Sequence, residues 1–220
     1  SNFMKEVNKF DGKPISEAAE NAIIDRTIRN VHKVYPTVPQ KDIEEDLDDL
    51  LDGLDKATIR EQLEELIQMY CKNWLAMDGV WFQSVEKKFG MDEAMVHDVN
   101  IWSQFTVIEA KKIKAFLQLP ERAGLDGLEK ALQLRLYANI NRDEILREGN
   151  KLIYRTLDCR VQSARSRKGM EWHPCKPVGE TEYSGFAKVI DDRITCRCIS
   201  CYPDITDKGC ACSWEFTLND

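Results

Sequence analysis

The cysteines near the carboxyl terminus are the residues of this chain best suited to chemistry. Cys198 and Cys201 are separated by two residues, so a tight turn can direct both thiolates to one metal ion. Cys212 follows eleven residues after Cys201 and is expected on a returning strand, which would place it beside this pair. These three thiols predict a site that lacks only one of the four ligands of a structural zinc ion.

The fourth ligand is less closely defined. Cys175 is expected at the start of a helix, where the positive end of the helix dipole favours a thiolate, and we take it as the fourth Zn²⁺ ligand. Cys159 is the rival candidate, and His173 is interpreted as an isolated surface residue. The same four thiolates could hold a [4Fe-4S] cluster instead. Alternatively, the cysteines are reduced side chains that act as small apolar residues.

Polar residues upstream of this cluster are candidates for ligand binding. Arg160, Gln162 and Arg165 lie in a basic stretch that is predicted to be a strand, and a guanidinium there could bind a carboxylate or a phosphate. The alternative is an edge strand that its charges protect from pairing. Asn100 stands among apolar residues of a predicted helix and is taken as a further ligand-binding candidate.

Two residues are candidates for catalysis. Glu109 lies in an apolar helical segment and could be a general base, although pairing with an arginine is the commoner role of such a residue. Cys159 could be a nucleophile. The dipeptide His97-Asp98 resembles the paired ligands of metal hydrolases but is not a motif by itself. The sequence contains no phosphate loop, nucleophile elbow or His-Glu-x-x-His motif.

Hydrophobic periodicity predicts an α+β protein in which helices precede a small antiparallel sheet. The predicted organisation is a variable acidic helical extension at 1–53, a helical region at 54–148 and a cysteine-rich α+β region at 149–220. Predicted helices cover 16–34, 42–56, 56–78 (ending at a break at Asp78-Gly79), 80–89, 91–117, 125–137, a short one capped by Asn141, and 175–190. Predicted strands cover 151–165, 193–200 and 212–218.

Composition limits the class of protein. The net charge of −7 argues against a nucleic-acid-binding surface, and no apolar run has the roughly 20 residues that a membrane helix needs. The amino terminus lacks the pattern of a secretory signal, so we expect a cytoplasmic protein. Clustered thiols in such a protein hold metals or do redox chemistry more often than they form disulfides.

Several segments resemble a family of uncharacterised cytosolic proteins from bacteria and archaea. The segments that carry this resemblance follow in the same order over roughly 54–218: MDGVWFQSVEKKFGMDEAM, NIWSQFTVIEAKKIKAFLQLP, LEKALQLRLYAN, DCRVQSARSRKG, PCKPVGETEYSGFA, CISCYPD and CSWEFTL. The residues that match the family's cysteine pattern are Cys159, Cys175, Cys198, Cys201 and Cys212, whereas Cys196 and Cys210 do not match it.

That family is in turn similar, more distantly, to the L-2-amino-thiazoline-4-carboxylate hydrolase group. Its cysteine pattern also resembles that of four-vinyl-reductase-type domains, in which a cysteine-coordinated zinc ion lies beside a small-molecule pocket. The resemblance therefore implies a metal site next to a pocket for a small molecule.

We expect a binding or sensory domain in which a structural metal lies beside a pocket for a small anionic molecule. One alternative is a metal-dependent hydrolase of a small carboxylic acid that contains nitrogen or sulfur, and another is an iron–sulfur protein of anaerobic metabolism. Four cysteine ligands would saturate zinc, whereas three would leave a position for an activated water molecule. The sequence leaves open whether the chain is an enzyme and whether it forms a homodimer.

Overall fold

The computed structural model describes residues 56–220, together with residues 25, 29, 37, 39 and 41. The acidic segment at 42–55 and most of the predicted helix at 16–34 lie outside these residues. The chain divides into two compact units, 1–67 and 68–220, and the sheet lies in the second. None of the helices in the described part is long and apolar enough to cross a membrane.

From residue 56 onward, where the description is continuous, four helical segments come before the sheet. They are α4 (Lys56–Phe89), α5 (Met91–Phe116), α6 (Gly124–Leu132) and the 3₁₀ helix η1 (Leu136–Asn139). Gly90 separates α4 from α5 with a φ of 92°, a conformation that favours glycine. The predicted break at Asp78-Gly79 is wrong, because α4 runs through it without interruption. One glycine inside a helix costs only about 1 kcal/mol, which the rest of a long helix can offset.

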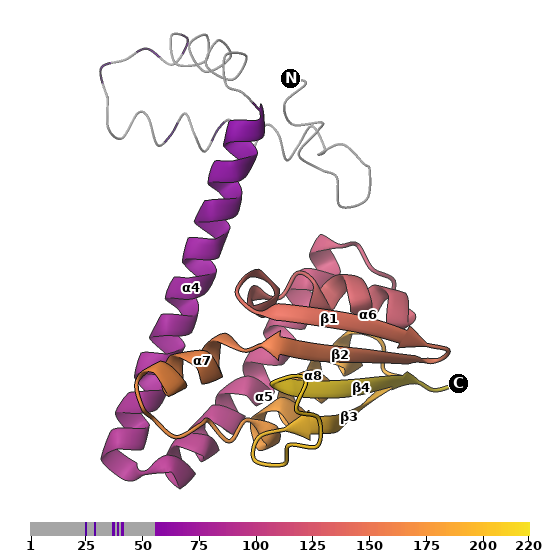
Figure 1. Ribbon diagram of the computed structural model, residues 1–220. Coiled ribbons are helices and arrows are strands. Elements are labelled where there is room, and N and C mark those ends of the chain that lie inside the picture. Colours follow the sequence, from indigo (N-terminus) through magenta and orange to yellow (C-terminus); the bar gives the residue numbers. More distant parts are fainter. Residues whose placement is uncertain (1–24, 26–28, 30–36, 38, 40, 42–55) are drawn as a thin grey trace. The chain divides into compact units, whose positions relative to one another are not determined.

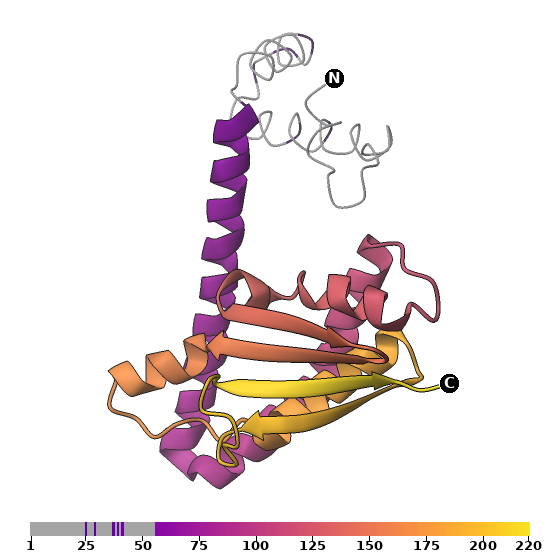
Figure 2. The same ribbon diagram turned by 45° about the vertical axis from the view of Figure 1, so that its right-hand side comes forward.

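A four-stranded antiparallel sheet forms the second half of this unit (Figure 1). Its strands are β1 (Arg142–Glu148), β2 (Lys151–Asp158), β3 (Ile194–Cys201) and β4 (Cys212–Leu218), in the order β1-β2-β4-β3. The helices α7 (Arg160–Arg167) and α8 (Lys176–Ile190) lie between β2 and β3 in the sequence. Figure 2 shows α8 and α5 stacked behind one face of the sheet. The α+β class, the helix α8 and the strands β3 and β4 confirm the sequence prediction.

Two predictions next to the sheet are wrong. The strand predicted at 151–165 ends at Asp158, and the chain then turns into α7. The short helix predicted after Asn141 is instead the strand β1, which pairs with β2 along its whole length. The side-chain oxygen of Asn141 accepts a hydrogen bond from the backbone N–H of Arg160, so this residue caps α7 rather than a helix of its own. Strand pairing has overridden the local capping signal.

The helix α8 lies unusually close to its neighbours on both sides. A Cβ atom at Gly179 would stand 2.4 Å from the ring of Trp214 on β4, and one at Gly185 would stand 2.8 Å from the methyl group of Thr106 on α5. The Thr106 hydroxyl also donates a 2.8 Å hydrogen bond to the backbone oxygen of Glu182. Two glycines and this hydrogen bond therefore set the distance of α8 from the sheet and from α5.

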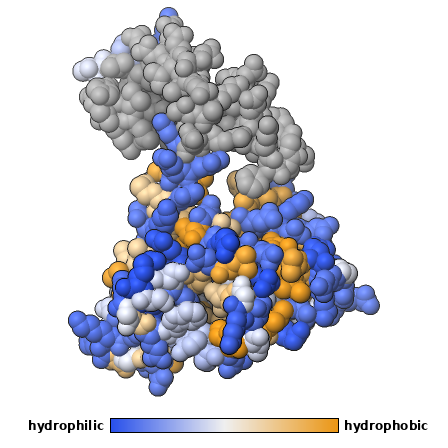
Figure 3. Space-filling model, viewed as in Figure 1, coloured by the Kyte–Doolittle hydropathy of each residue, from blue (hydrophilic) through white to orange (hydrophobic). Residues whose placement is uncertain are grey.

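Some large apolar side chains remain exposed on the helices. Trp74 of α4 stacks on Phe105 of α5, with ring centroids 5.0 Å apart. Tyr70, Met77 and Trp81, elsewhere on α4, are 63% to 71% exposed. Figure 3 shows apolar atoms interspersed with hydrophilic ones on the described part of one face.

Gly179→Ala should destabilise the fold. The added methyl group overlaps the Trp214 ring, so we expect a loss of about 1–3 kcal/mol in the free energy of unfolding, measured by urea denaturation. Gly79→Ala is the matched control, because its Cβ would meet only Gln83 Nε2 at 3.8 Å. That helix substitution should be neutral or stabilising by up to about 1 kcal/mol. Equal stability of the two variants would contradict the close approach of α8 to Trp214.

Candidate functional site

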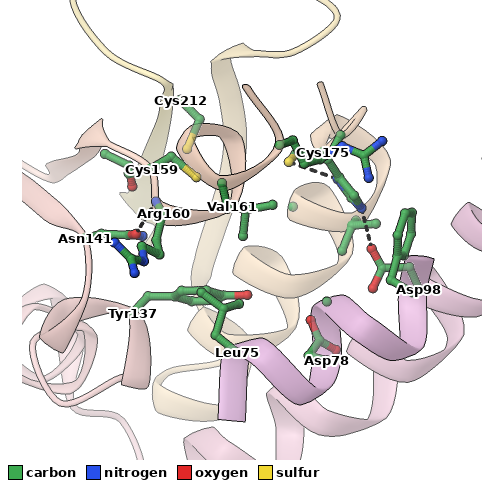
Figure 4. Close-up of a pocket in the computed structure, with 18 of the residues that line it drawn as sticks. Leu75, Asp78, Asp98, Tyr137, Asn141, Cys159, Arg160, Val161, Cys175 and Cys212 are labelled. Atoms are coloured by element: carbon green, nitrogen blue, oxygen red, sulfur yellow. Dashed lines mark hydrogen bonds and ion pairs between the residues drawn. The ribbon is translucent and has the colours of Figure 1, made fainter. Parts of the chain in front are cut away.

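A pocket of about 320 Å³ lies where α4, α7 and the start of α8 meet the ends of β2, β3 and β4. This volume is suited to a small molecule. Its walls are mainly apolar, and Figure 4 shows their side chains converging from these separate elements. The residues that line it include Asp78, Phe82, Asp98, Trp102, Tyr137, Cys159, Arg160, His173, Cys175, Gly179, Glu182, Tyr183, Cys201, Cys212 and Trp214.

Four of the eight cysteines line this pocket. Cys201 and Cys212 are direct partners in the β3–β4 register, as the sequence predicts. Cys175 is the N-cap residue of α8, and the next residue along the chain donates a 3.1 Å backbone hydrogen bond to the carbonyl of Tyr202. Cys159 is the N-cap residue of α7. The two helix starts thus bring both rival cysteines to the β3–β4 pair.

Cys198, which the sequence predicts as a metal ligand, is placed differently from the other three. It packs against the hydrophobic core and does not line the pocket. A shift in register between Cys198 and Ser200 separates it from the Cys201–Cys212 pair. Within the part of the chain that the structure describes, no group of three or more His, Cys, Asp or Glu side chains is arranged to hold a metal ion. Zinc and the [4Fe-4S] cluster therefore stay predictions, as does the ligand set of Cys175, Cys198, Cys201 and Cys212.

A histidine connects one of the pocket thiols to a carboxylate. His173 is 8% exposed, so its interpretation as a surface residue is wrong. Its Nδ1 atom lies 3.1 Å from Cys175 Sγ, and its Nε2 atom lies 2.9 Å from the Oδ2 atom of Asp98 on α5. The ring also packs on Phe82, with centroids 4.6 Å apart. Figure 4 shows this chain of contacts along one wall of the pocket.

Gln162 fixes the segment that carries this histidine. Its amide oxygen accepts a 3.0 Å hydrogen bond from the backbone N–H of His173, and its amide nitrogen donates a 2.8 Å hydrogen bond to the backbone oxygen of the same residue. That nitrogen also lies 3.3 Å from Cys175 Sγ. Gln162, which is 5% exposed, therefore orients both Cys175 and His173.

Neighbouring groups shift the ionisation of the pocket residues. A hydrogen bond from Cys201 lowers the pKa of Cys175, but burial and the adjacent thiols raise it, so that the pKa stays above its ordinary value. The thiol of Cys212 hydrogen-bonds with Cys201 and is buried, which together raise the pKa of Cys212. Burial raises the pKa of Asp78 to about 6, and the charge of Asp98 adds to this rise.

The basic residues of α7 have distinct positions. Arg165 makes two hydrogen bonds to Glu86 of α4, at 2.8 and 2.7 Å, and a third to the backbone oxygen of Glu171. It thus ties α7 to α4. Arg160 is exposed beside the pocket, and its guanidinium makes no hydrogen bond or ion pair with the residues described. Asn100 is exposed on α5 and does not line the pocket.

Glu109 lies away from the pocket and pairs with an arginine. Its Oε2 atom accepts a 2.9 Å hydrogen bond from Arg135 Nε, and Glu182 accepts a 2.5 Å hydrogen bond from the same guanidinium.

Sequence reasoning did not find Arg135 or Glu182. It singled out the His97-Asp98 dipeptide, but His97 is exposed and pairs with Glu93, while Asp98 alone faces the pocket. The sequence feature that indicates the site is His173, because it lies two residues before Cys175, the cysteine at the start of α8.

A family model matches residues 56–218 of this chain. The chain belongs to DUF6125, a family of unknown function. The DUF6125 match spans every pocket residue and nearly all of the described part of the chain. No curated protein matches the sequence. DUF6125 membership confirms the resemblance to an uncharacterised family, and the similarity to the hydrolase and four-vinyl-reductase groups stays a prediction.

Arg165→Met should weaken the fold, whereas Arg160→Met should not. The first change leaves the Glu86 carboxylate and the Glu171 carbonyl without their donor, for which we expect a loss of about 1–3 kcal/mol in the free energy of unfolding. The second removes an exposed guanidinium without a partner among the described residues, so the change should stay within about 0.5 kcal/mol. Urea denaturation of the two variants tests this contrast. Equal losses would show that Arg165 does not tie α7 to α4.

Proposed function

We propose that this protein is a thiol-dependent enzyme that acts on a small molecule held in the pocket, with Cys175 as the nucleophile. The observation that carries this proposal is the continuous contact of Cys175 Sγ with His173 Nδ1 and of His173 Nε2 with Asp98 Oδ2. A nucleophile, a base and a group that orients the base are the three parts of a nucleophilic site. All three residues line one pocket.

The reaction follows from these positions. Cys175 Sγ forms a bond to an electrophilic carbon of the bound molecule as its proton passes to His173 Nδ1. Asp98 accepts a hydrogen bond from Nε2–H and stabilises the imidazolium that forms. The proton then moves from His173 to the leaving group as the bond between carbon and leaving group breaks. Water then gives a proton to His173 Nδ1 as its oxygen forms a bond to the carbon, the bond between that carbon and Cys175 Sγ breaks, and His173 returns the proton to Sγ. The overall reaction is a hydrolysis.

The pocket supports a small, partly apolar substrate. Five aromatic residues contribute to its lining: Phe82, Trp102, Tyr137, Tyr183 and Trp214. Arg160 beside it offers a guanidinium that can bind a carboxylate or a phosphate through two parallel hydrogen bonds. A small anionic molecule fits this combination. The resemblance to the L-2-amino-thiazoline-4-carboxylate hydrolase group favours a carboxylic acid that contains nitrogen or sulfur.

Binding of a thiophilic metal is the second candidate, and the meeting of four thiols in one pocket favours it. Zn²⁺ prefers such thiolate ligands. Since no three donors among the described residues are already arranged for a metal, the thiols would have to move to bind one. Cys175 would then be a ligand rather than a nucleophile, and the domain would bind or sense its small molecule beside a structural metal. A [4Fe-4S] cluster would need the same rearrangement.

Reaction with p-nitrophenyl acetate tests the proposed function. Reduced protein treated with a chelator should release one p-nitrophenolate per chain in a rapid burst and carry one acetyl group on Cys175, located by mass spectrometry. Cys175→Ala should lose the burst, and Asp98→Asn should slow it by about 100-fold, in the range of general acid–base effects. Cys210→Ser is the matched control, because Cys210 does not line the pocket and should leave the burst unchanged.

Two results would contradict this proposal. A burst of unchanged size in Cys175→Ala would assign the reactivity to another thiol. A metal ion that copurifies with the protein in a 1:1 ratio and blocks acetylation of Cys175 until it is removed would favour the second candidate. Elemental analysis of protein purified without oxygen distinguishes zinc from iron in that case.

A further inference from the structure

The segments that carry Cys175 and Cys201 are joined by their backbones. The N–H of Lys176 donates a 3.1 Å hydrogen bond to the carbonyl of Tyr202, so the residues that follow the two cysteines are in direct contact. The N–H of Cys201 in turn donates a 3.2 Å hydrogen bond to the carbonyl of Asp204, which fixes the turn after β3. Neither cysteine can therefore move far from the other while these backbone contacts hold.

The two thiols face the same pocket. Cys175 and Cys201 both line it, and each thiol shifts the pKa of the other. Cys201 is 1% exposed, so the pocket side of Cys175 is the route by which a small reagent would reach the pair. Because the backbones of the two segments are joined, rotation of the two side chains is the movement that would bring the sulfur atoms to the bond length of about 2.0 Å in a disulfide.

We infer that Cys175 is a site of reversible oxidation and that Cys201 is its resolving cysteine. Hydrogen peroxide would oxidise the Cys175 thiol to a sulfenic acid and be reduced to water. Cys201 Sγ would then attack the Cys175 sulfur, so that an S–S bond forms and the S–O bond breaks. The hydroxyl group leaves as water with the proton of Cys201. A small dithiol would reduce the disulfide and return both thiols.

The neighbours of each thiol explain this assignment. Cys175 alone among the pocket cysteines touches an imidazole, which can accept its proton when the sulfur is oxidised. Cys201 is the direct partner of Cys212 in the β3–β4 register and lines the pocket together with Cys175. Cys212 is therefore a rival partner for Cys201 among the pocket thiols. Cys201 is thus the thiol placed to form a disulfide with oxidised Cys175.

The disulfide would block the nucleophile of the reaction proposed above. This regulatory consequence rests on the proposed function, whereas formation of the disulfide does not. Oxidised protein should give no burst with p-nitrophenyl acetate, and dithiothreitol should restore the burst completely. A reduced protein that never gives a burst but still forms the disulfide would remove the proposed function and leave the oxidation site in place.

Disulfide mapping of the full chain after treatment with hydrogen peroxide tests the inference. Two of the eight thiols should disappear, and non-reducing tryptic digestion should link the peptide 169–188, which holds Cys175, to the peptide 198–208, which holds Cys201. The peptide 198–208 also holds Cys198, which does not line the pocket. Cys198→Ser should therefore keep the link. Cys201→Ser should lose it and leave a Cys175 sulfenic acid that dimedone labels.

Two outcomes would overturn the inference. One is a link between the peptides 198–208 and 209–220, which would show a bond between the strands β3 and β4 instead. The other is retention of all eight thiols in peroxide-treated protein whose reduced form gives the full burst. The burst serves as the control for folding of Cys198→Ser, because Cys198 does not line the pocket.

Discussion

One buried arginine holds together the two helices that carry Asp98 and Cys175. Arg135 is 1% exposed and binds Glu109 of α5 and Glu182 of α8. A buried guanidinium is strongly unfavourable unless carboxylates pair with it, so both helices must present their carboxylates at the same point. The same two helices carry Asp98 and, at the start of α8, Cys175. Rings of four aromatic residues enclose the guanidinium: Trp102, Tyr137, Tyr183 and Phe186.

The pocket exists because α8 begins where the sheet ends. Gly179 allows the helix to lie directly on Trp214, which holds its first turn against the ends of β3 and β4. A bulkier residue there would lift this turn and separate Cys175 from Cys201. Burial raises the pKa of Glu182 to about 7 although Arg135 opposes this rise, so the cluster brings a carboxyl group that titrates near neutral pH to the wall of the pocket.

Much of the fold and the meeting of Cys159, Cys175, Cys201 and Cys212 could be predicted from local pattern, but the partners of Cys175 in the pocket could not. Helical and alternating periodicities identify α5, α8, β3 and β4, since the apolar residues of each repeat at its own spacing. The strand β1 is rich in charge and is defined by its pairing with β2, which no local pattern shows. His173 meets Asp98 across 75 residues of sequence, and its burial follows from this tertiary contact. The sequence predicts Cys198 beside Cys201, but the register shift of β3 leaves Cys198 half-buried against the core.

The most direct test is the rate at which each cysteine of the folded, reduced protein reacts with iodoacetamide at neutral pH, followed by mass spectrometry. If Cys175, His173 and Asp98 act together, Cys175 is the first pocket thiol to be alkylated, and Asp98→Asn slows its reaction alone. Alkylation of Cys175 no faster than that of Cys159, Cys201 or Cys212, in the wild type and in Asp98→Asn alike, would contradict the account.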